Sequence, residues 1–377
     1  MEDEKPANTN RLRSFLINLL LTLCSIGLSF AALEFFLWAW GGTHAAQPPP
    51  RTVAVPAPAS PDSDIPIPPE VRAIAEGRYK LLTLPDEWKH TPAPTPAGAD
   101  DAQYWHGALH VRNSDRMRWA GPFPERRSDT YRVMVVGDSL TYGVGLAEQW
   151  RFSSLAEQSL GRQFRIEFLN LGIAGAQSED VLFFVRKYLP ILQPNLVIYA
   201  VCLNDFLPSG IGQYTTQAAY PFPLPDGIKT FLIQNTRSGA FLNESYDAAL
   251  RRLHLRADFF DDILADFGGY QNRFARDVQD INKSVQAAGL PPLVGIVVDQ
   301  FPAYDSAGYR IAMIAEAALR QAGAAVIPTE DYYRRYNGQS FYISRWEGHP
   351  NEIANIIWAN MIAQVLSKRE NLQAFRR

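Results

Sequence analysis

The chain has 377 residues, of which 47% are hydrophobic and 20% charged, so it can build one large core or two smaller ones. The formal net charge of -3, with no long basic block, argues against nucleic acid as a partner. The two cysteines, Cys24 and Cys202, lie in an apolar stretch and in a predicted buried strand, so we expect no disulfide and no cysteine metal site.

The N-terminal stretch Ser14 to Leu33 carries no charge and is long enough to cross a bilayer as a helix. Arg11 and Arg13 precede it, and the next basic residue is Arg51. The positive-inside rule therefore predicts a cytoplasmic N-terminus, with the rest of the chain outside. The alternative is a signal peptide cleaved after Ala31, but the apolar run continues past that point into an aromatic cluster typical of a membrane interface.

Two proline-dense stretches follow, from Gln47 to about Glu70 and from Thr91 to Gly98, with one short helix predicted between them at Val71 to Leu84. Such composition favours an extended spacer. We therefore divide the chain into a tail and membrane anchor, a proline-rich linker, and a folded domain with an insertion. The predicted ranges are 1–45, 46–100 and 101–370, with the insertion at about 207–270.

The segment Tyr104 to Arg127 contains His106 and His110, which would share a face only on a helix. The surrounding residues are rich in turn formers, and no third ligand is near. We expect a loop that covers the domain here, and no metal site.

Beyond residue 130, short apolar runs alternate with segments of helical periodicity. The runs predict strands at Arg132–Val136, Ile166–Leu171, Leu196–Val201, Leu293–Val298 and Ala324–Ile327. Helices are predicted at Phe274–Ala288, Ala307–Ala322 and Ile353–Leu366, with a further helical pattern in the insertion at Tyr246–Phe267. This alternation predicts an α/β fold, a doubly wound parallel sheet with helices on both faces.

Distinctive turns follow several of the predicted strands, where an open parallel sheet binds its ligands. The turns are Gly137-Asp138-Ser139, then Asn170 to Gly175, then Asn204-Asp205, and Glu347 to Asn351 before the last helix. A serine between a strand and a helix lies among free backbone N–H groups, which favour developing negative charge. Together, these four turns would place a nucleophile, a base and amide donors at one edge of the sheet.

These blocks resemble those of the SGNH (GDSL) hydrolases, in the same order, over roughly Tyr131 to Leu366. The matching residues are Gly137-Asp138-Ser139-Leu140, Gly175, Asn204-Asp205 and His349-Pro350-Asn351. The resemblance implies a flavodoxin-like α/β/α domain and ester chemistry without a cofactor. It implies that Ser139 is the nucleophile and His349 the general base. It also implies an oxyanion hole made of the Ser139 and Gly175 N–H groups and the Asn204 side-chain amide.

The sequence departs from the family pattern at two positions. The usual aspartate three residues before the histidine is Trp346 here, so Glu347 is our candidate for orienting His349, with a backbone carbonyl as the alternative. Cys202 replaces the usual glycine of the third block, and its Cβ would tilt Asn204 if the backbone needed a close approach there. We interpret Asp138 and Asp205 as residues that stabilise their turns.

The leading hypothesis is therefore a serine esterase on the outer side of a bacterial inner membrane, in the periplasm. It would be anchored by a single span and remove O-acetyl groups from a cell-envelope polysaccharide. An O-acyltransferase with a membrane acyltransferase as partner would use the same residues, because both reactions pass through an acyl-serine intermediate. The two substitutions leave a third hypothesis, a silent polysaccharide-binding module.

Overall fold

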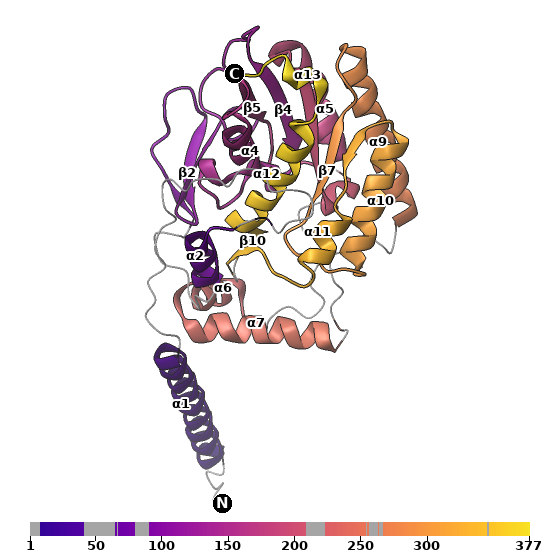
Figure 1. The fold of residues 1–377 in the computed structure, drawn as a ribbon. Helices are drawn as coiled ribbons and strands as arrows, with labels where there is room; N and C mark the ends of the chain where they lie inside the picture. Colours follow the sequence, from indigo (N-terminus) through magenta and orange to yellow (C-terminus); the bar gives the residue numbers. More distant parts are fainter. Residues whose placement is uncertain are drawn as a thin grey trace, which may run out of the picture. The chain divides into compact units, whose positions relative to one another are not determined.

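A computed structural model describes residues 8–40, 65, 67–79, 90–208, 223–253, 255, 263, 267–344 and 347–377 (Figure 1). The chain forms two compact units. The helical unit comprises Met1–Ala45 and Tyr220–Leu255, and the α/β unit comprises Ala46–Ala219 and Arg256–Arg377.

The α/β unit is built on a parallel sheet with strand order β5-β4-β6-β7-β8. Its strands are β4 (Tyr131–Gly137), β5 (Ile166–Asn170), β6 (Leu196–Cys202), β7 (Val294–Val298) and β8 (Ala325–Ile327). All residues of β4, β6 and β7 are buried, as the continuous apolar runs predicted for strands covered on both faces. The doubly wound, flavodoxin-like fold predicted from the sequence is confirmed.

Helices cover the sheet in two packed groups (Figure 1). Helices α4 (Phe152–Leu160) and α12 (Glu352–Leu366) pack together, and α9 (Phe267–Ala287) packs against both α5 (Ser178–Leu192) and α10 (Ala307–Gln321). The described part of this unit also contains the short helices α3 (Ser139–Tyr142), α11 (Glu330–Arg335) and α13 (Glu370–Gln373).

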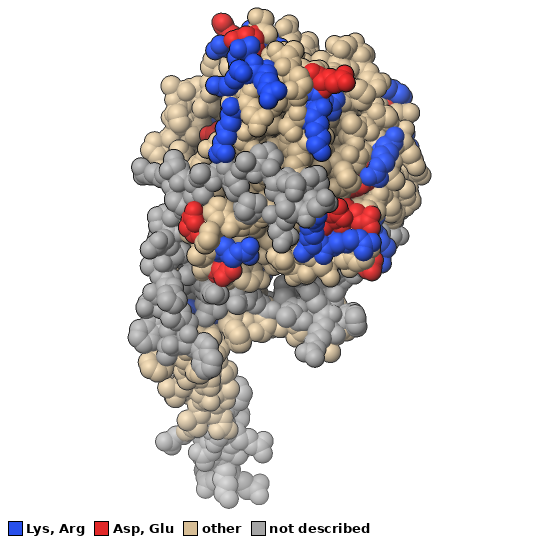
Figure 2. All heavy atoms as spheres, viewed as in Figure 1, with Lys and Arg blue, Asp and Glu red and all other residues tan. Residues whose placement is uncertain are grey.

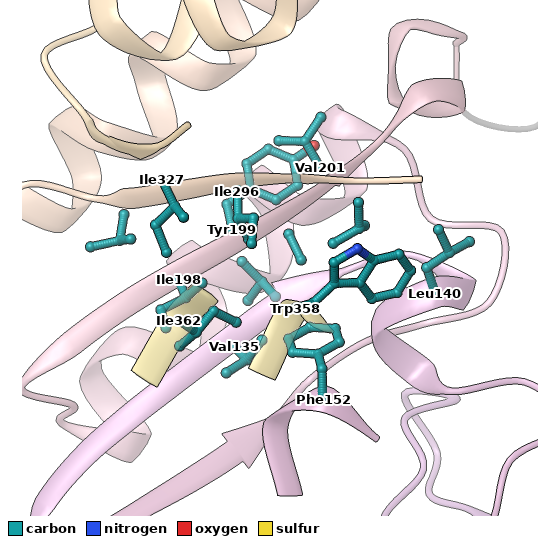
Figure 3. Packing of buried hydrophobic residues seen from close by; sticks show 14 of the residues in the cluster. Val135, Leu140, Phe152, Ile198, Tyr199, Val201, Ile296, Ile327, Trp358 and Ile362 are labelled. Carbon is teal, nitrogen blue, oxygen red and sulfur yellow. The ribbon is translucent and has the colours of Figure 1, made fainter. Parts of the chain in front are cut away.

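Helix α12 is apolar on nearly every side, because it is buried between α4 and other elements. Figure 3 shows its Trp358 beside Phe152 of α4, with ring planes at 80° and centroids 6.2 Å apart. Both side chains are fully buried, so this contact anchors α12 to the core.

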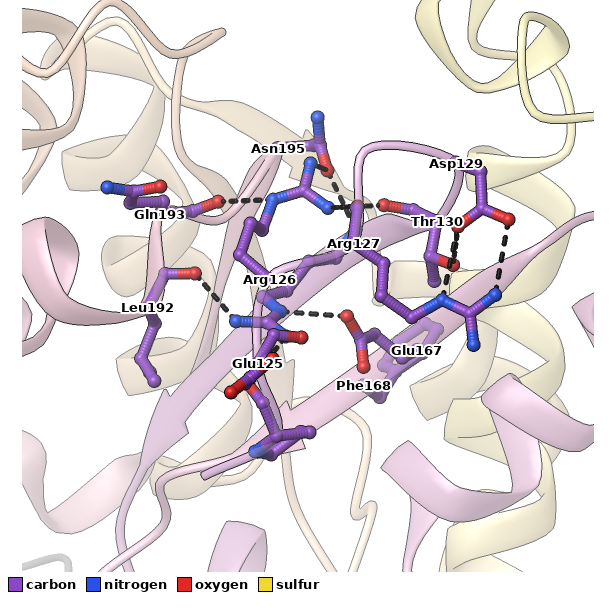
Figure 4. A network of polar contacts seen from close by, with 12 residues as sticks. Glu125, Arg126, Arg127, Asp129, Thr130, Glu167, Phe168, Leu192, Gln193 and Asn195 are labelled. Atoms are coloured by element: carbon purple, nitrogen blue, oxygen red, sulfur yellow. Dashed lines mark hydrogen bonds and ion pairs between the residues drawn. The ribbon is translucent and has the colours of Figure 1, made fainter. Parts of the chain in front are cut away.

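A polar network ties the starts of the strands together (Figure 4). The buried Arg132 donates to Glu167 Oε1 at 2.8 Å and to the Leu192 carbonyl at 2.9 Å. The Asn195 side chain accepts from the Arg132 backbone N–H and from Arg126. The network therefore stabilises the amino ends of β4, β5 and β6, and the opposite edge of the sheet is left for ligands.

Part of the predicted linker belongs to the folded unit. Helix α2 (Pro69–Tyr79) lies within the range 46–100, yet its Val71 and Ala75 are buried. Its Arg78 forms a buried ion pair with Glu352 of α12. The short helix predicted at Val71 to Leu84 is thus present, beginning at Pro69 and ending at Tyr79, and residues 80–84 lie outside the described residues.

The segment predicted to be a covering loop is an antiparallel hairpin, β2 (Asp101–Trp105) and β3 (Ala108–Arg112), which β1 (Thr91–Pro92) extends. A second small sheet pairs β9 (Tyr342–Ser344) with β10 (Glu347–Pro350). His106 occupies the hairpin turn with a left-handed φ of 50°, and His110 lies on β3.

The helical unit contains α1 (Asn8–Trp40), α6 (Asp226–Asn235) and α7 (Arg237–Arg252). Among the described residues, Leu16–Leu37 of α1 is the one stretch long and apolar enough to cross a membrane, a property that signal sequences share. Helix α7 begins and ends earlier than the helix predicted at Tyr246–Phe267, and most of 254–266 lies outside the described residues. On the face that Figure 2 shows, basic and acidic side chains are interspersed, as the small net charge suggests.

Candidate active site

Ser139 lies at a sharp turn where β4 passes into α3. A Cβ at Gly137 would approach Thr141 Oγ1 to 2.2 Å and the Ala200 carbonyl to 2.6 Å, so only glycine fits at the end of this strand. Asp138 caps α3 by accepting the Leu140 N–H at 2.9 Å. The turn therefore presents Ser139 at the first position of a helix, and its half-buried hydroxyl donates to Asp138 Oδ2 at 3.2 Å.

The loop after β5 lies directly against this turn. A Cβ at Gly172 would come within 2.2 Å of the Tyr142 backbone nitrogen, so glycine allows the loop to touch α3. The Asn170 amide secures the contact by donating to the Thr141 carbonyl at 2.7 Å. Further along, Gly175 is exposed with a left-handed φ of 83°, a conformation that suits glycine.

The third block forms a short 3-10 helix, Leu203–Phe206, immediately after β6. Cys202 has φ of -90°, which any residue adopts, so its Cβ does not require the displacement of Asn204 considered above. The Asn204 side-chain oxygen is buried with no hydrogen-bond partner among the described residues, and the oxyanion role expected of its NH₂ group remains a prediction.

Two buried carboxyl groups lie beneath the turn. Asp205 accepts hydrogen bonds from the Tyr199 hydroxyl at 2.7 Å and the Cys202 N–H at 3.1 Å, and the Cys202 thiol donates to Asp138. Burial raises the pKa of both Asp138 and Asp205, and the Asp138 charge raises that of Asp205 further. Their contacts fit the structural roles predicted for them.

His349 lies on β10, which packs against α3. Its Nδ1 is bonded to Glu347 Oε1, and its backbone N–H donates to the same oxygen at 3.2 Å. Glu347 thus occupies the position proposed for orienting the imidazole, leaving Nε2 as the nitrogen that can exchange a proton with a substrate or a hydroxyl. Trp346 lies outside the described residues.

Two further residues hold the other oxygen of this carboxylate. The Trp105 indole N–H donates to Glu347 Oε2 at 2.9 Å, and His106 Nε2 lies 3.5 Å from it. Burial opposes ionisation of Glu347, but the hydrogen bonds from His106 and His349 outweigh it and hold the pKa of the carboxyl well below its usual range. The carboxylate therefore stays charged beside the imidazole.

Sequence reasoning did not identify Trp105 and His106 as parts of the site. They lie 242 and 241 positions before Glu347 in the chain, in a segment expected only to cover the domain. An alignment showing that Trp105 varies together with Glu347 could have revealed the pairing.

The structure brings the four blocks to the carboxyl edge of the sheet. The loops that carry Gly175 and Asn204 leave β5 and β6, the two neighbours of β4, and α3 contacts β10. The His349 charge also acts on the Asp138 carboxyl next to the serine. The Ser139 hydroxyl itself donates to Asp138 Oδ2 in this structure.

The described residues contain no cluster of three or more His, Cys, Asp or Glu side chains that could hold a metal ion.

Comparison with known proteins gives a family match. Residues 135–355 match the sequence profile of the GDSL-like lipase/acylhydrolase family. A search of curated proteins found no relative. Among solved structures, the chain is similar to TesA (15% identity, 62% of this chain and 97% of that chain, TM-score 0.40). It is also similar to the esterase EstA from Pseudoalteromonas sp. (15%, 63% and 97%, 0.38) and to a mutant of the acetylxylan esterase Axe2 from Geobacillus stearothermophilus (10%, 62% and 93%, 0.40).

Proposed function

Because the chain belongs to the GDSL-like lipase/acylhydrolase family and is a carboxylic ester hydrolase, we propose that it removes small acyl groups through an acyl-Ser139 intermediate. The resemblance seen in the sequence blocks is confirmed for the family, the fold and the reaction class. The observation that carries the proposal is the bond between Glu347 and His349 on a strand packed against the helix that begins at Ser139.

In the proposed mechanism, Ser139 Oγ attacks the ester carbonyl while His349 Nε2 takes its proton. Glu347 fixes the ring through Nδ1 and stabilises the imidazolium that forms. The imidazolium then gives the proton to the leaving alcohol, which departs and leaves the acyl group on Ser139. Water attacks the acyl-serine by the same steps and releases the acid.

The tetrahedral oxyanion would be bound by the N–H groups of Ser139 and Gly175 and by the Asn204 amide. Ser139 is the first residue of α3, Asn204 is the second residue of the 3-10 helix Leu203–Phe206, and Gly175 is exposed on the loop after β5. Pre-placed donors of this kind stabilise negative charge that develops in the transition state.

We further propose that the enzyme acts outside the cytoplasm, on O-acetyl groups of a cell-envelope polysaccharide. An apolar N-terminal helix preceded by Arg11 and Arg13 supports a single span with the hydrolase on the outer side. Axe2, one of the similar solved structures, is named as an acetylxylan esterase, so the substrate named for that protein is an acetylated polysaccharide.

The test is hydrolysis of an acetylated chromogenic ester by the full-length protein in detergent, together with fluorophosphonate labelling. We expect Ser139→Ala to abolish both, and Asn204→Ala to lower kcat by about 10²–10³-fold, as expected for one lost oxyanion donor. Labelling that persists in Ser139→Ala, or full activity in Asn204→Ala, would contradict the proposed site.

The acyl acceptor is tested in the same assay by adding an oligosaccharide. Hydrolysis predicts that free acetate accumulates at an unchanged rate. If acetyl groups appear on the sugar faster than free acetate is released, the acceptor is a sugar hydroxyl rather than water, and the reaction is acyl transfer.

A further inference from the structure

Large apolar side chains are exposed on the helical unit outside α1. Seven lie between residues 224 and 255, and Phe231 is 62% exposed and Ile228 52%. The set is Leu224, Ile228, Phe231, Phe241, Leu242, Leu253 and Leu255. Ile228 and Phe231 lie on α6, and Phe241 and Leu242 lie on the first half of α7, so apolar surface that water disfavours is exposed on both helices near their junction.

The junction of α6 and α7 is bonded to the end of α1. Glu34 accepts the N–H groups of Arg237 and Ser238 at 3.1 and 2.7 Å, and the Ser238 hydroxyl at 2.6 Å. These bonds satisfy donors that the first turn of α7 would otherwise leave open. In return, the Arg237 side chain donates to the Leu37 carbonyl at 3.3 Å, in the last turn of α1.

The junction itself is compact. Thr236 Oγ1 donates to the Leu232 carbonyl at 2.8 Å and accepts the Gly239 N–H at 2.9 Å. A Cβ at Gly239 would come within 2.5 Å of the Leu232 carbonyl, so the two helices touch at their backbones. The bonds from Glu34 therefore position α6 as well as α7.

These contacts determine the depth of the junction in a bilayer. The apolar stretch of α1 ends at Leu37, three residues beyond Glu34, which corresponds to about 4.5 Å along a helix. A carboxylate this close to hydrocarbon needs partners, and the start of α7 supplies them. The start of α7 must then lie at the outer boundary of the hydrocarbon.

We propose that α6 and the first half of α7 lie in the membrane interface, with Leu224, Ile228, Phe231, Phe241 and Leu242 in contact with lipid acyl chains. The occupant of this apolar surface is the bilayer itself, because the Glu34 contacts join the surface directly to the membrane span. This inference rests on the proposed span, and it makes the anchor a three-helix element rather than a single helix.

The test uses the full-length protein in phosphatidylcholine/phosphatidylglycerol vesicles with an NBD fluorophore at single cysteines. Phe231→Cys and its neighbour Thr230→Cys are made in a Cys24→Ser background. Thr230 is also exposed but points about 100° away on the same helix. Cys202 is buried and burial raises the pKa of its thiol, so it resists labelling.

A lipid carrying a doxyl quencher near the headgroup should quench the label at 231 several-fold more strongly than the label at 230. Equal quenching at the two positions, or quenching of 231 by aqueous iodide, overturns the proposal. A blue-shifted label at 231 that neither quencher reaches also overturns it, since a second copy of the chain would then cover the surface.

Two further arms separate the causes. The label at the native Cys24, near the middle of Leu16–Leu37, reports on the span alone and is tested with a lipid that carries the doxyl group deep in its acyl chain. If this lipid quenches Cys24 while the headgroup quencher does not reach 231, only the present proposal fails; if it does not quench Cys24, the span itself fails. The substitution Glu34→Ala in the Phe231→Cys protein should lower the quenching by lipid of the label at 231. The substitution Glu34→Gln in the same protein keeps an acceptor oxygen and should lower this quenching less. Unchanged quenching in Glu34→Ala would overturn the role given to Glu34.

Discussion

The carboxylate beside His349 shows how a single residue is positioned by distant parts of the chain. Glu347 lies two residues before the histidine, and its extra methylene relative to aspartate allows Oε1 to reach Nδ1. Its second oxygen is held by Trp105 from the β2–β3 hairpin. A hydrogen bond to a charged group contributes about 1.5–3 kcal/mol, so the indole should matter for the orientation of the imidazole.

We predict that Trp105→Phe lowers kcat for an acetyl ester by about 10-fold or more, the rate equivalent of losing one charge-assisted hydrogen bond. KM should change little, because the indole contacts Glu347 rather than the expected acyl group. Steady-state kinetics on the full-length protein measure both parameters.

The matched control is Trp119→Phe, which removes an indole that donates to the Pro122 carbonyl at 3.4 Å, away from Glu347. We expect this variant to keep the parental kcat. Equal losses in the two variants would mean that Trp105 only supports the fold.

At the scale of elements, the β2–β3 hairpin and the segment after it support the nucleophile helix. The His110 ring stacks on Tyr142 of α3, with centroids 5.5 Å apart. The buried Arg118 donates to the Gly143 and Leu146 carbonyls at 3.0 and 2.7 Å. A loop predicted only to cover the domain is thus part of the scaffold that holds Ser139.

His110 gives this hairpin a pH-dependent stability. Both ring nitrogens are buried without a hydrogen bond among the described residues, and burial, with nearby Arg118 and Arg151, lowers the pKa of His110 to about 2. The unfolded chain takes up a proton near pH 6.5, whereas the folded protein does not. The stability that comes from neutral His110 is therefore present above pH 6.5 and is lost as the pH falls below it.

We predict that His110→Phe removes this loss while keeping the ring stack. The difference between the free energies of unfolding of the variant and of wild type should increase in favour of the variant by about 1.4 kcal/mol for each pH unit below 6.5. Urea unfolding between pH 7 and pH 4.5 measures it. Parallel curves for wild type and His110→Phe would contradict the prediction.

At the scale of the whole molecule, the proposed anchor sets where the reaction takes place. Arg11 and Arg13 lie on the N-terminal side of the apolar stretch, and Leu16–Leu37 has the length of a span. Glu34 is bonded to α7, so the end of α1 is also a structural part of the helical unit.

We predict that the mature protein keeps its N-terminus and remains in the membrane fraction after an alkaline wash. An alkaline phosphatase fused to the C-terminus should be active, since the domain would lie outside the cytoplasm. Mass spectrometry of the purified chain distinguishes the alternatives: a new N-terminus at Ala32 would show that the apolar stretch is a cleaved signal. Arg11→Glu with Arg13→Glu should weaken the orientation and lower the phosphatase activity.

Much of the α/β unit could be predicted because its signals are local. Buried parallel strands need continuous apolar runs such as Leu196–Val201, and covering helices need a periodic apolar face, so both patterns are visible in one sequence. The order of the four blocks allowed the family and its reaction class to be recognised. The roles of Ser139, Gly175, Asn204, Glu347 and His349 remain predictions.

Other features could not be seen before the chain was folded, because they depend on contacts between residues far apart in sequence. Nothing local in Trp105 indicates that its indole reaches Glu347, and nothing in Arg78 indicates a buried partner on α12. A short helix was predicted where α2 lies, but its composition did not show that one face would be buried, since such burial needs only a few small apolar residues. Periodicity and motif order established the type of fold and the chemistry, whereas only three-dimensional packing selected the partners of each polar group, because hydrogen bonds and ion pairs form between neighbours in space.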